Sequence, residues 1–443
     1  MSWTDFVLPL GYLALFLWII QKAAVFKTTV ISVRALQFAF ILRVISGFAV
    51  YWIYTFYYPV RLEADTYKYF DDSKYLFEAL HHKPQDFFKM LFGVDCENKY
   101  FFDTYYTKMF NWYRSYDNGL LNDNRLVIRF NAVIRLFSAG NYHVHSLFFN
   151  FFAFVGSFYL ARVFMAVSQS KWRTYLAVFL IPSFIFWSSG ILKESILILA
   201  LGIFCWNFYK LMNGQKSIGL WLSLPFLIAI LLVMKLYVFI AFLPALLGWW
   251  LSKNTKRTLL VHGLTAVSLL TLAVTWGYFV PQLNFVHILV DKQHDFINLA
   301  NTFNVNSKID IPVLDYSFFS FVKAIPEALL NSLTRPWPTE LKSILFIPAF
   351  LENIFIIFII GASIFYRKKV NPNQWKFVVF ALAFSIFHLL IIGLTTPILG
   401  AIVRYKIPAL PFLILVSLLF LDVQKLPHFI IQNKWIKWLN TLL

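Results

Sequence analysis

The sequence has few charged residues. Only 14% of its 443 residues are charged and 60% are hydrophobic, whereas roughly 25% of the residues in an ordinary soluble domain are charged. So much apolar surface cannot be hidden inside one globule of this size, which excludes a soluble enzyme and a disordered chain. The composition therefore predicts an all-α polytopic membrane protein.

Cysteine is almost absent, because Cys96 and Cys205 are the only two. One falls in a polar segment and the other in an apolar one, so we expect neither a disulfide framework nor a cysteine-rich metal site. The N-terminus lacks a basic stretch and a small-residue cleavage site, which argues against a removable signal peptide. Phosphate-binding loops, dinucleotide fingerprints and nucleophile elbows are also missing.

Acidic residues are scarce, with 21 against 39 basic residues and a net charge of +18. In a soluble protein this excess would indicate nucleic acid. In a membrane protein it reflects the accumulation of Lys and Arg on the cytoplasmic side. We therefore expect no nucleic-acid partner.

About eleven apolar segments are long enough to be membrane spans, which need roughly 20 residues, or fewer where neighbouring helices shield the ends. They are 5–21, 36–58, 143–166, 174–188, 191–209, 219–234, 236–251, 258–279, 343–366, 377–394 and 398–421. Alternate connections between them, together with the C-terminal tail, hold 17 basic residues. The positive-inside bias makes those connections cytoplasmic, with the N-terminus outside and the C-terminus inside. A bacterial cytoplasmic membrane fits this pattern, and an endoplasmic reticulum membrane is the alternative.

Three regions follow from these spans. Residues 1–35 form an extra N-terminal span and its connection, 36–421 form the main membrane domain, and 422–443 form a basic and aromatic cytoplasmic tail. Two long polar segments, 59–142 and 280–342, are expected to lie outside.

Segment 59–142 holds eleven of the 21 acidic residues. Asp65 follows directly after an aromatic span end, which places it near the lipid headgroups. A carboxylate there can serve as a general base or hold a divalent cation such as Mg²⁺ or Mn²⁺ against a phosphate. Asp71 and Asp72 are weaker candidates, with Glu63 as a supporting residue. The alternative is that these acids pair with the eleven basic residues of the same segment.

Residues 124–137 of this segment show a helical apolar pattern. They predict an amphipathic helix that lies in the membrane interface or packs on its own loop.

Basic residues at the outer ends of spans run against the positive-inside bias. They are Lys193, Lys235, Arg404 and Lys406, with Arg335 near the end of the second external segment. Each could be a snorkelling anchor or half of an ion pair, and Glu194 could neutralise Lys193. Together they indicate an anion-binding rim, since Arg and Lys bind phosphate.

Ionisable residues within spans are costly and therefore also candidates. Glu352 and His388 are of this kind, although a hydrogen bond to a neighbouring helix explains them as well. His143 and His145 are too close in sequence for a helical metal pair.

Short motifs resemble the GT-C glycosyltransferases, membrane enzymes that use polyprenyl-phosphate-linked sugars, and within them the bacterial relatives of protein mannosyltransferases. They are the acidic segment after an aromatic span end, Phe186-Trp-Ser-Ser-Gly-Ile-Leu-Lys-Glu194 and Arg404-Tyr-Lys-Ile-Pro-Ala-Leu-Pro411. The resemblance implies a base or metal ligand at Asp65, and donor-phosphate binding by Arg404, then Lys193 and Arg335, with Tyr405 as a supporting residue. The extra first span and the lack of an Asp-x-Asp pattern depart from the family.

The sequence therefore predicts an inverting transferase that moves a sugar from a polyprenyl-phosphate donor to an acceptor glycan, lipid or protein outside the membrane. A polymerase or ligase of lipid-linked glycans is the first alternative. A flippase or transporter of a lipid-linked anion is the second, and it requires polar groups that continue through the bilayer.

Overall fold

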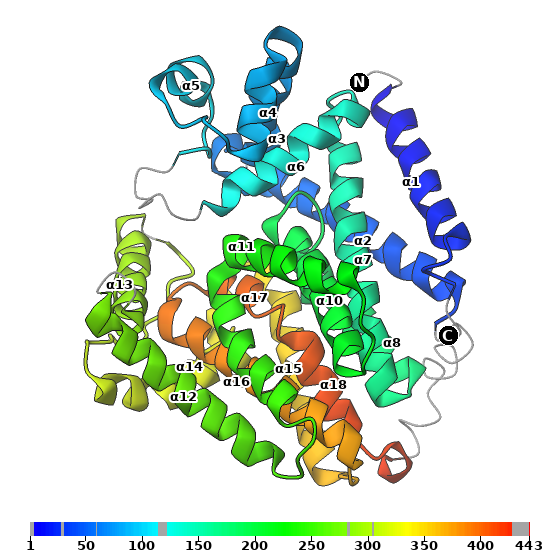
Figure 1. The fold of residues 1–443 in the computed structure, drawn as a ribbon, viewed down its shortest axis with the longest axis vertical. Helices are drawn as coiled ribbons and strands as arrows, with labels where there is room; N and C mark the ends of the chain where they lie inside the picture. Colours follow the sequence, from blue (N-terminus) through cyan, green and yellow to red (C-terminus); the bar gives the residue numbers. More distant parts are fainter. Residues whose placement is uncertain are drawn as a thin grey trace. The chain divides into compact units, whose positions relative to one another are not determined.

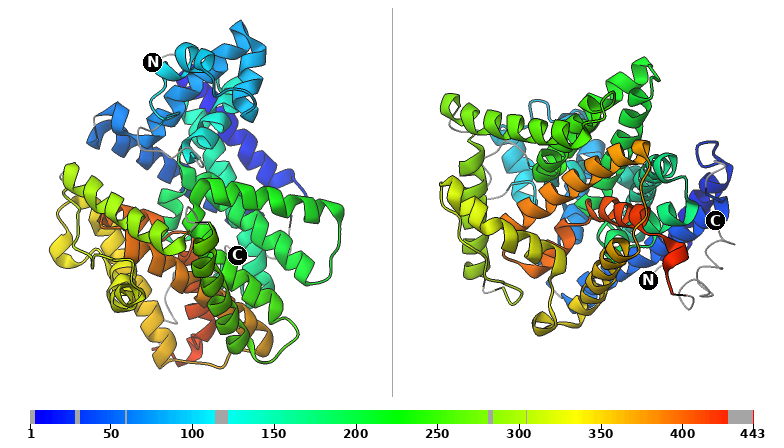
Figure 2. Two further views of the ribbon diagram at one scale, coloured as in Figure 1. Left: turned by 60° about the vertical axis from the view of Figure 1, so that its left-hand side comes forward. Right: turned by 90° about the horizontal axis from the view of Figure 1, so that it is seen from below.

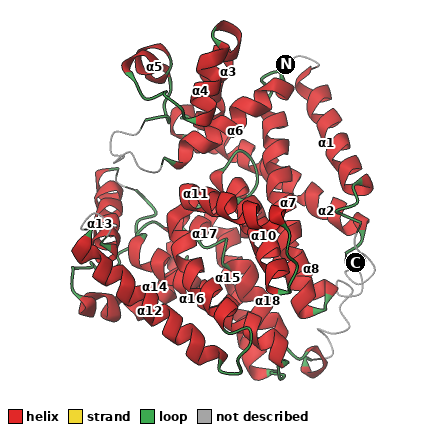
Figure 3. Cartoon of the chain, viewed as in Figure 1, coloured by secondary structure: helices red, strands yellow, loops and turns green. Residues whose placement is uncertain are grey.

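A computed structural model describes residues 4–27, 31–58, 60–113, 122–280, 284–303, 305–427 and 443. Every regular element in these ranges is a helix, which confirms the all-α prediction (Figure 3). The chain forms two compact units. The first consists mainly of Met1–Val163 and Ile185–Leu236, and the second of Phe164–Phe184 and Tyr237–Thr441.

Eighteen α-helices follow one another along the described parts of the chain (Figure 1). The first ten are α1 (Thr4–Lys22), α2 (Val33–Trp52), α3 (Asp65–His82), α4 (Pro84–Phe92), α5 (Lys99–Thr104), α6 (Asp123–Ser138), α7 (Tyr142–Ser168), α8 (Lys171–Phe179), α9 (Pro182–Trp187) and α10 (Lys193–Met212). The others are α11 (Ile218–Leu251), α12 (Thr258–Phe279), α13 (Phe285–Thr302), α14 (Phe318–Thr334), α15 (Ile347–Phe365), α16 (Pro372–Thr395), α17 (Leu399–Tyr405) and α18 (Leu410–Phe420).

Seven helical segments in the described parts are long and apolar enough to cross a membrane. They are Val33–Tyr57, Tyr142–Ser168, Lys193–Met212, Ile218–Leu251, Thr258–Gly277, Ile344–Phe365 and Pro372–Thr395. The pair α17 and α18, bent by 65°, makes an eighth if it counts as one span. Helices of this length and composition indicate an integral membrane protein.

The predicted count of eleven spans is larger than the seven or eight found among the described helices, for three reasons. The first segment, 5–21, corresponds to the shorter apolar helix α1. Segment 174–188 is divided between α8 and α9, because the chain leaves helical geometry at Leu180 and Pro182 cannot supply a backbone N–H. Segments 219–234 and 236–251 are counted as one helix, α11, although the backbone leaves helical geometry at Lys235, where φ is −156° and ψ is 87°, so the predicted break between them is present.

The surface of α12 shows why these helices suit a lipid environment. Leu259, Leu264 and Val267 are each about 60% exposed, although large apolar side chains are usually buried in soluble proteins. A continuous apolar surface of this kind is stable when hydrocarbon covers it.

In the first unit, α7 and α10 cross with their backbones almost in contact. A Cβ atom added to Gly202 would lie 1.8 Å from the carbonyl oxygen of Gly156, so only glycine fits at this crossing. Helix α6 packs on α3 in the same unit, with Val127 and Ile128 buried. Residues 124–137 therefore form a helix packed on its own segment, and Leu136 and Phe137 stay exposed at its far end.

In the second unit, segment 280–342 is mostly helical. Helix α14, yellow, lies along α16, orange (Figure 2). The backbones are so close that a Cβ added to Gly393 would lie 1.9 Å from the carbonyl oxygen of Ala328. Helix α13 is fixed to the end of α16 by Gln293, whose Nε2 donates to the carbonyl oxygen of Leu394 at 2.6 Å. The predicted external segment is therefore tightly packed over much of its length.

Candidate functional site

The predicted site residues are divided between the two units. The first unit holds Glu63, Asp65, Asp71, Asp72, Lys193, Glu194 and Lys235. The second holds Arg335, Arg404, Tyr405 and Lys406. Each unit is described separately below.

Asp65 is the first residue of α3 and is half-buried. It follows a short 3-10 turn, Arg61–Glu63, in which Glu63 is exposed. The partial positive charge at a helix N-terminus stabilises a carboxylate in the first turn. Asp65 therefore lies at the helix N-terminus, ahead of the other predicted acids of α3.

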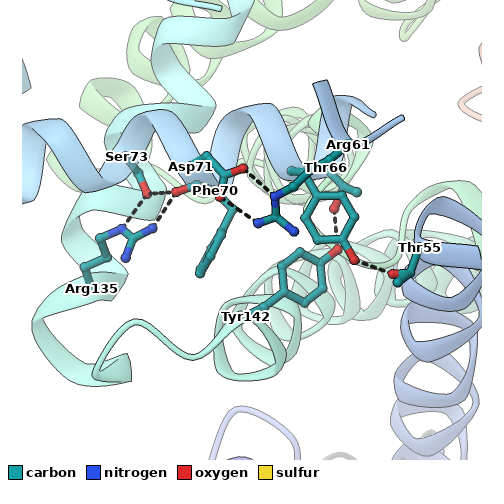
Figure 4. Close-up of polar contacts among 9 residues, drawn as sticks. Thr55, Arg61, Thr66, Phe70, Asp71, Ser73, Arg135 and Tyr142 are labelled. Atoms are coloured by element: carbon teal, nitrogen blue, oxygen red, sulfur yellow. Dashed lines mark hydrogen bonds and ion pairs between the residues drawn. The ribbon is translucent and has the colours of Figure 1, made fainter. Parts of the chain in front are cut away.

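Asp71 is held by Arg61 in a two-point ion pair (Figure 4). The Nε atom of Arg61 donates to one carboxylate oxygen at 2.9 Å and Nη2 donates to the other at 2.7 Å. The Arg61 guanidinium also lies 4.0 Å from the centre of the Tyr67 ring. These contacts fix the turn before α3, so Asp71 has a structural explanation.

Asp72 is fully buried and accepts two backbone hydrogen bonds, from Phe110 N at 2.9 Å and from Asn111 N at 2.7 Å. Burial raises the pKa of Asp72 to about 6, because the two hydrogen bonds stabilise the carboxylate only in part. Asp72 thus ties the loop around residue 110 to α3.

A second buried contact fixes the other end of the same layer. Arg135 on α6 donates from Nε to Ser73 Oγ at 2.8 Å and from Nη2 to the Phe70 carbonyl at 2.6 Å (Figure 4). Beside it, Tyr142 shares a hydrogen bond with Thr66. Helix α3 is therefore held on both sides of its predicted acids.

Lys193, the first residue of α10, forms an ion pair with Asp123 at 2.6 Å. The side chains of Lys193 and Asp123 are only 7% and 15% exposed. The Lys193 ammonium also lies 5.7 Å from the centre of the Tyr69 ring on α3. A predicted phosphate-binding cation therefore lies beside α3, the helix that carries the predicted acids.

Asp123 is a residue that the sequence reasoning did not single out. In the sequence, Asp123 is one of the eleven acids of segment 59–142, and Glu194, which is buried, is the predicted neutralising group of Lys193. The sequence feature that could have identified Asp123 is its place one residue after the N-cap Asn122, at the start of the amphipathic helix.

Lys235 lies at the break in α11 and is half-buried.

In the second unit, Asn353 links two of the predicted cations. Its Oδ1 accepts a hydrogen bond from Lys406 Nζ at 2.6 Å, and its Nδ2 donates to the carbonyl oxygen of Arg335 at 2.6 Å. Lys406 is 1% exposed and lies at the break between α17 and α18. Arg404 is half-buried on α17.

The intramembrane candidates have protein partners. Glu352 accepts hydrogen bonds from Ser183 N at 2.6 Å and from Ser183 Oγ at 2.5 Å. His388 Nε2 donates to the carbonyl oxygen of Tyr405 at 2.9 Å. Both residues can thus be explained by contacts with a neighbouring helix, the alternative that the sequence left open.

Arg335 lines a polar cleft of about 280 Å³ in the second unit. Its Nη1 forms an ion pair with Glu340 at 2.6 Å, and its guanidinium lies 4.6 Å from the centre of the Trp337 ring. The Nε atom of Arg335 is buried and has no hydrogen-bond partner within the described part of the chain. The cleft is therefore a place where a ligand could meet one of the predicted cations.

A divalent metal is not supported by the donor groups. No three His, Cys, Asp or Glu side chains in the described ranges lie close enough together to hold one. The oxygens of Asp71 and Asp72 are also engaged by Arg61 and by backbone N–H groups. We derive no step that uses a metal.

Comparisons with known proteins give no match for the chain, whether with protein-family models, with curated proteins or with solved structures.

Proposed function

We propose that the chain is an integral membrane glycosyltransferase that takes a sugar from a polyprenyl-phosphate donor. The observation that carries this proposal is the polar cleft at Arg335, whose buried Nε has no hydrogen-bond partner among the described residues. An arginine that lines a polar cleft is suited to bind a phosphate. The short motifs that resemble GT-C enzymes give the reaction type, and together with the position of Asp65 after an aromatic span end they assign Asp65 as the base.

The proposed reaction is one direct displacement. The acceptor oxygen attacks the anomeric carbon while Asp65 takes the hydroxyl proton. The bond between that carbon and the phosphate oxygen breaks, and the polyprenyl phosphate leaves with the electron pair. The resemblance to GT-C enzymes assigns stabilisation of the charge that develops on the leaving group to Arg404, Lys193 and Arg335. Displacement in one step inverts the configuration at the anomeric carbon.

The test is transfer by the purified, reconstituted protein from a panel of polyprenyl-phosphate sugars, followed as release of polyprenyl phosphate. We expect Asp65→Asn to lower the rate by about 10²–10⁴-fold, as removal of a general base does. Asp103→Asn is the matched control, because Asp103 is an exposed acid in the same segment. Wild-type protein that releases no polyprenyl phosphate from any donor would refute the function. Equal rates for the two variants would refute the role of Asp65.

We further propose eleven spans in a bacterial cytoplasmic membrane, with the N-terminus outside and the C-terminus inside. Both native cysteines are buried, so introduced cysteines can report accessibility. A membrane-impermeant maleimide should label Lys99→Cys in intact spheroplasts, and Lys369→Cys only after permeabilisation, because both lysines are exposed. Labelling of Lys369→Cys in intact spheroplasts, and of Lys99→Cys only after permeabilisation, would show that the orientation is the opposite one.

Transport of a lipid-linked anion stays the second candidate because of Arg43. This arginine lies within α2 and is 1% exposed. Its Nη1 and Nη2 donate to the hydroxyls of Ser188 and Ser157, at 2.6 and 2.7 Å. A charge in a span is typical of transport pathways. Translocation in reconstituted vesicles without any glycosylated product would favour this function.

A further inference from the structure

The polar cleft of the second unit has a rigid frame. One wall is the segment 306–310, which pairs with the chain just before α17: Ile309 N donates to the Pro397 carbonyl and Leu399 N to the Ser307 carbonyl, both at 2.9 Å. The other wall is the turn after α14, held by the Arg335–Glu340 ion pair. Leu399 and Phe346 supply apolar lining.

Several charged groups of the cleft already have partners. Glu340 accepts from Arg335 with one oxygen and from Trp337 N, at 2.8 Å, with the other. Lys308 Nζ donates to Asn301 Oδ1 at 2.6 Å. These contacts hold Glu340 and Lys308 in place and leave Glu340 no free oxygen for a ligand.

Other groups are available. The side chains of Asp310 and Lys342 are exposed and have no hydrogen bond or ion pair within the ranges that the structure describes. The hydroxyl of Thr339 and the amide of Asn306 also line the cleft. The buried Nε of Arg335 lacks an acceptor among the described residues. The cleft thus combines cations with one uncommitted carboxylate and small polar groups.

We propose that this cleft binds a sugar phosphate, with the cations Lys342, Lys308 and Arg335 holding the phosphate and Asp310 accepting hydrogen bonds from the sugar hydroxyls. The three cations Lys308, Arg335 and Lys342 outnumber the two carboxylates Asp310 and Glu340, and this net positive charge favours an anion. The volume, slightly below the ~300–1,000 Å³ of pockets for drug-sized ligands, suits one monosaccharide phosphate. An apolar floor with Phe346 suits the carbon face of a sugar ring.

The inference rests on the proposed function in one respect, since the sugar phosphate would then be the headgroup of the lipid donor. A free sugar phosphate has the same chemistry. Sequence reasoning missed Lys308, Asp310 and Lys342, because a polar loop carries no periodic signal that distinguishes a ligand contact from a solvated charge.

The test is calorimetric binding to the detergent-purified full chain. The probes are the 1-phosphates of glucose, galactose, mannose and N-acetylglucosamine, the same sugars linked to geranyl phosphate, and inorganic phosphate. We expect Lys342→Ala to weaken binding of a sugar phosphate at least about tenfold, as loss of a charged hydrogen bond does. Asp310→Asn should weaken binding of a sugar phosphate and leave binding of inorganic phosphate unchanged. Lys323→Ala, an exposed lysine of α14 outside the cleft, is the matched control.

Each outcome decides the proposal. Binding that Lys342→Ala and Asp310→Asn reduce supports it, and stronger binding of the geranyl-linked probes identifies the lipid headgroup as the source. No binding of any sugar phosphate, or equal binding by all three variants, overturns it. Binding of a sugar phosphate without any sugar transfer would refute the proposed function but support the cleft as a binding site. Sugar transfer with an unchanged donor KM in Lys342→Ala would support the proposed function but refute the cleft as the donor site.

Discussion

The ion pair between Lys193 and Asp123 should be a strong contact in the first unit. Their side chains are 7% and 15% exposed and the charged atoms are 2.6 Å apart. Removing one partner of a buried pair leaves an uncompensated charge and costs about 3–5 kcal/mol. Because Asp123 keeps some exposure, we expect Asp123→Asn to lower the free energy of unfolding by about 3 kcal/mol, at the low end of that range.

A double-mutant cycle separates this pair from its surroundings. Asp123→Asn, Lys193→Met and the double variant would be unfolded reversibly in mixed detergent micelles and followed by near-UV circular dichroism. We expect a coupling energy of about 1–3 kcal/mol. The exposed pair Lys74–Glu78, 3.6 Å apart, is the control, with an expected coupling of about 0.3–0.5 kcal/mol. If the effects of Asp123→Asn and Lys193→Met simply add, the reasoning is refuted.

Three further predictions concern stability in the same assay. The folded-state pKa of Asp72 is raised from 3.8 to about 6, so the folded state binds more protons between these values. The free energy of unfolding should therefore fall by up to about 3 kcal/mol as pH rises through this window and stay constant above it. Asp72→Asn should abolish this pH dependence. If the pH dependence persists in Asp72→Asn, it does not come from Asp72. Gly202→Ala should be strongly destabilising, because the added Cβ would lie 1.8 Å from the carbonyl oxygen of Gly156. Gly263→Ala should leave stability unchanged, because Gly263 has open space around it. Similar effects of the two substitutions would show that α7 and α10 do not cross as closely as described. Asp71→Asn should cost at most about 1 kcal/mol, since its ion pair is 34–52% exposed, and a larger loss would show that the pair is better shielded.

Long apolar helices were predictable from the sequence. A helix buries its backbone polar groups internally, so a run such as 377–394 needs no information from the rest of the chain. The sequence predicted the break at Lys235, between two apolar segments, whereas the division of 174–188 depends on local backbone geometry that composition does not reveal. The sequence therefore predicted the fold class better than the number of spans.

Site residues were predictable by type, and less so by partner. Lys193 was singled out as a cation at a span end, but its partner Asp123 lies far away in the sequence. Glu352 was noticed because a charge in a span is costly, whereas the adjacent Asn353 is polar without charge and was passed over. Pairing of this kind is decided by tertiary packing, which a single sequence does not encode locally.

The bend between α17 and α18 limits how far the pair can reach across a membrane. At about 1.5 Å per residue, the two arms are roughly 10 and 16 Å long. With an angle of 65° between them, the two helical arms alone, without residues 406–409 between them, reach about 21 Å along an upright α18. The hydrocarbon layer is about 30 Å thick. Because most of α18 is buried among neighbouring helices, the polar groups at the break meet protein and not lipid, as the hydrogen bond from Lys406 to Asn353 shows.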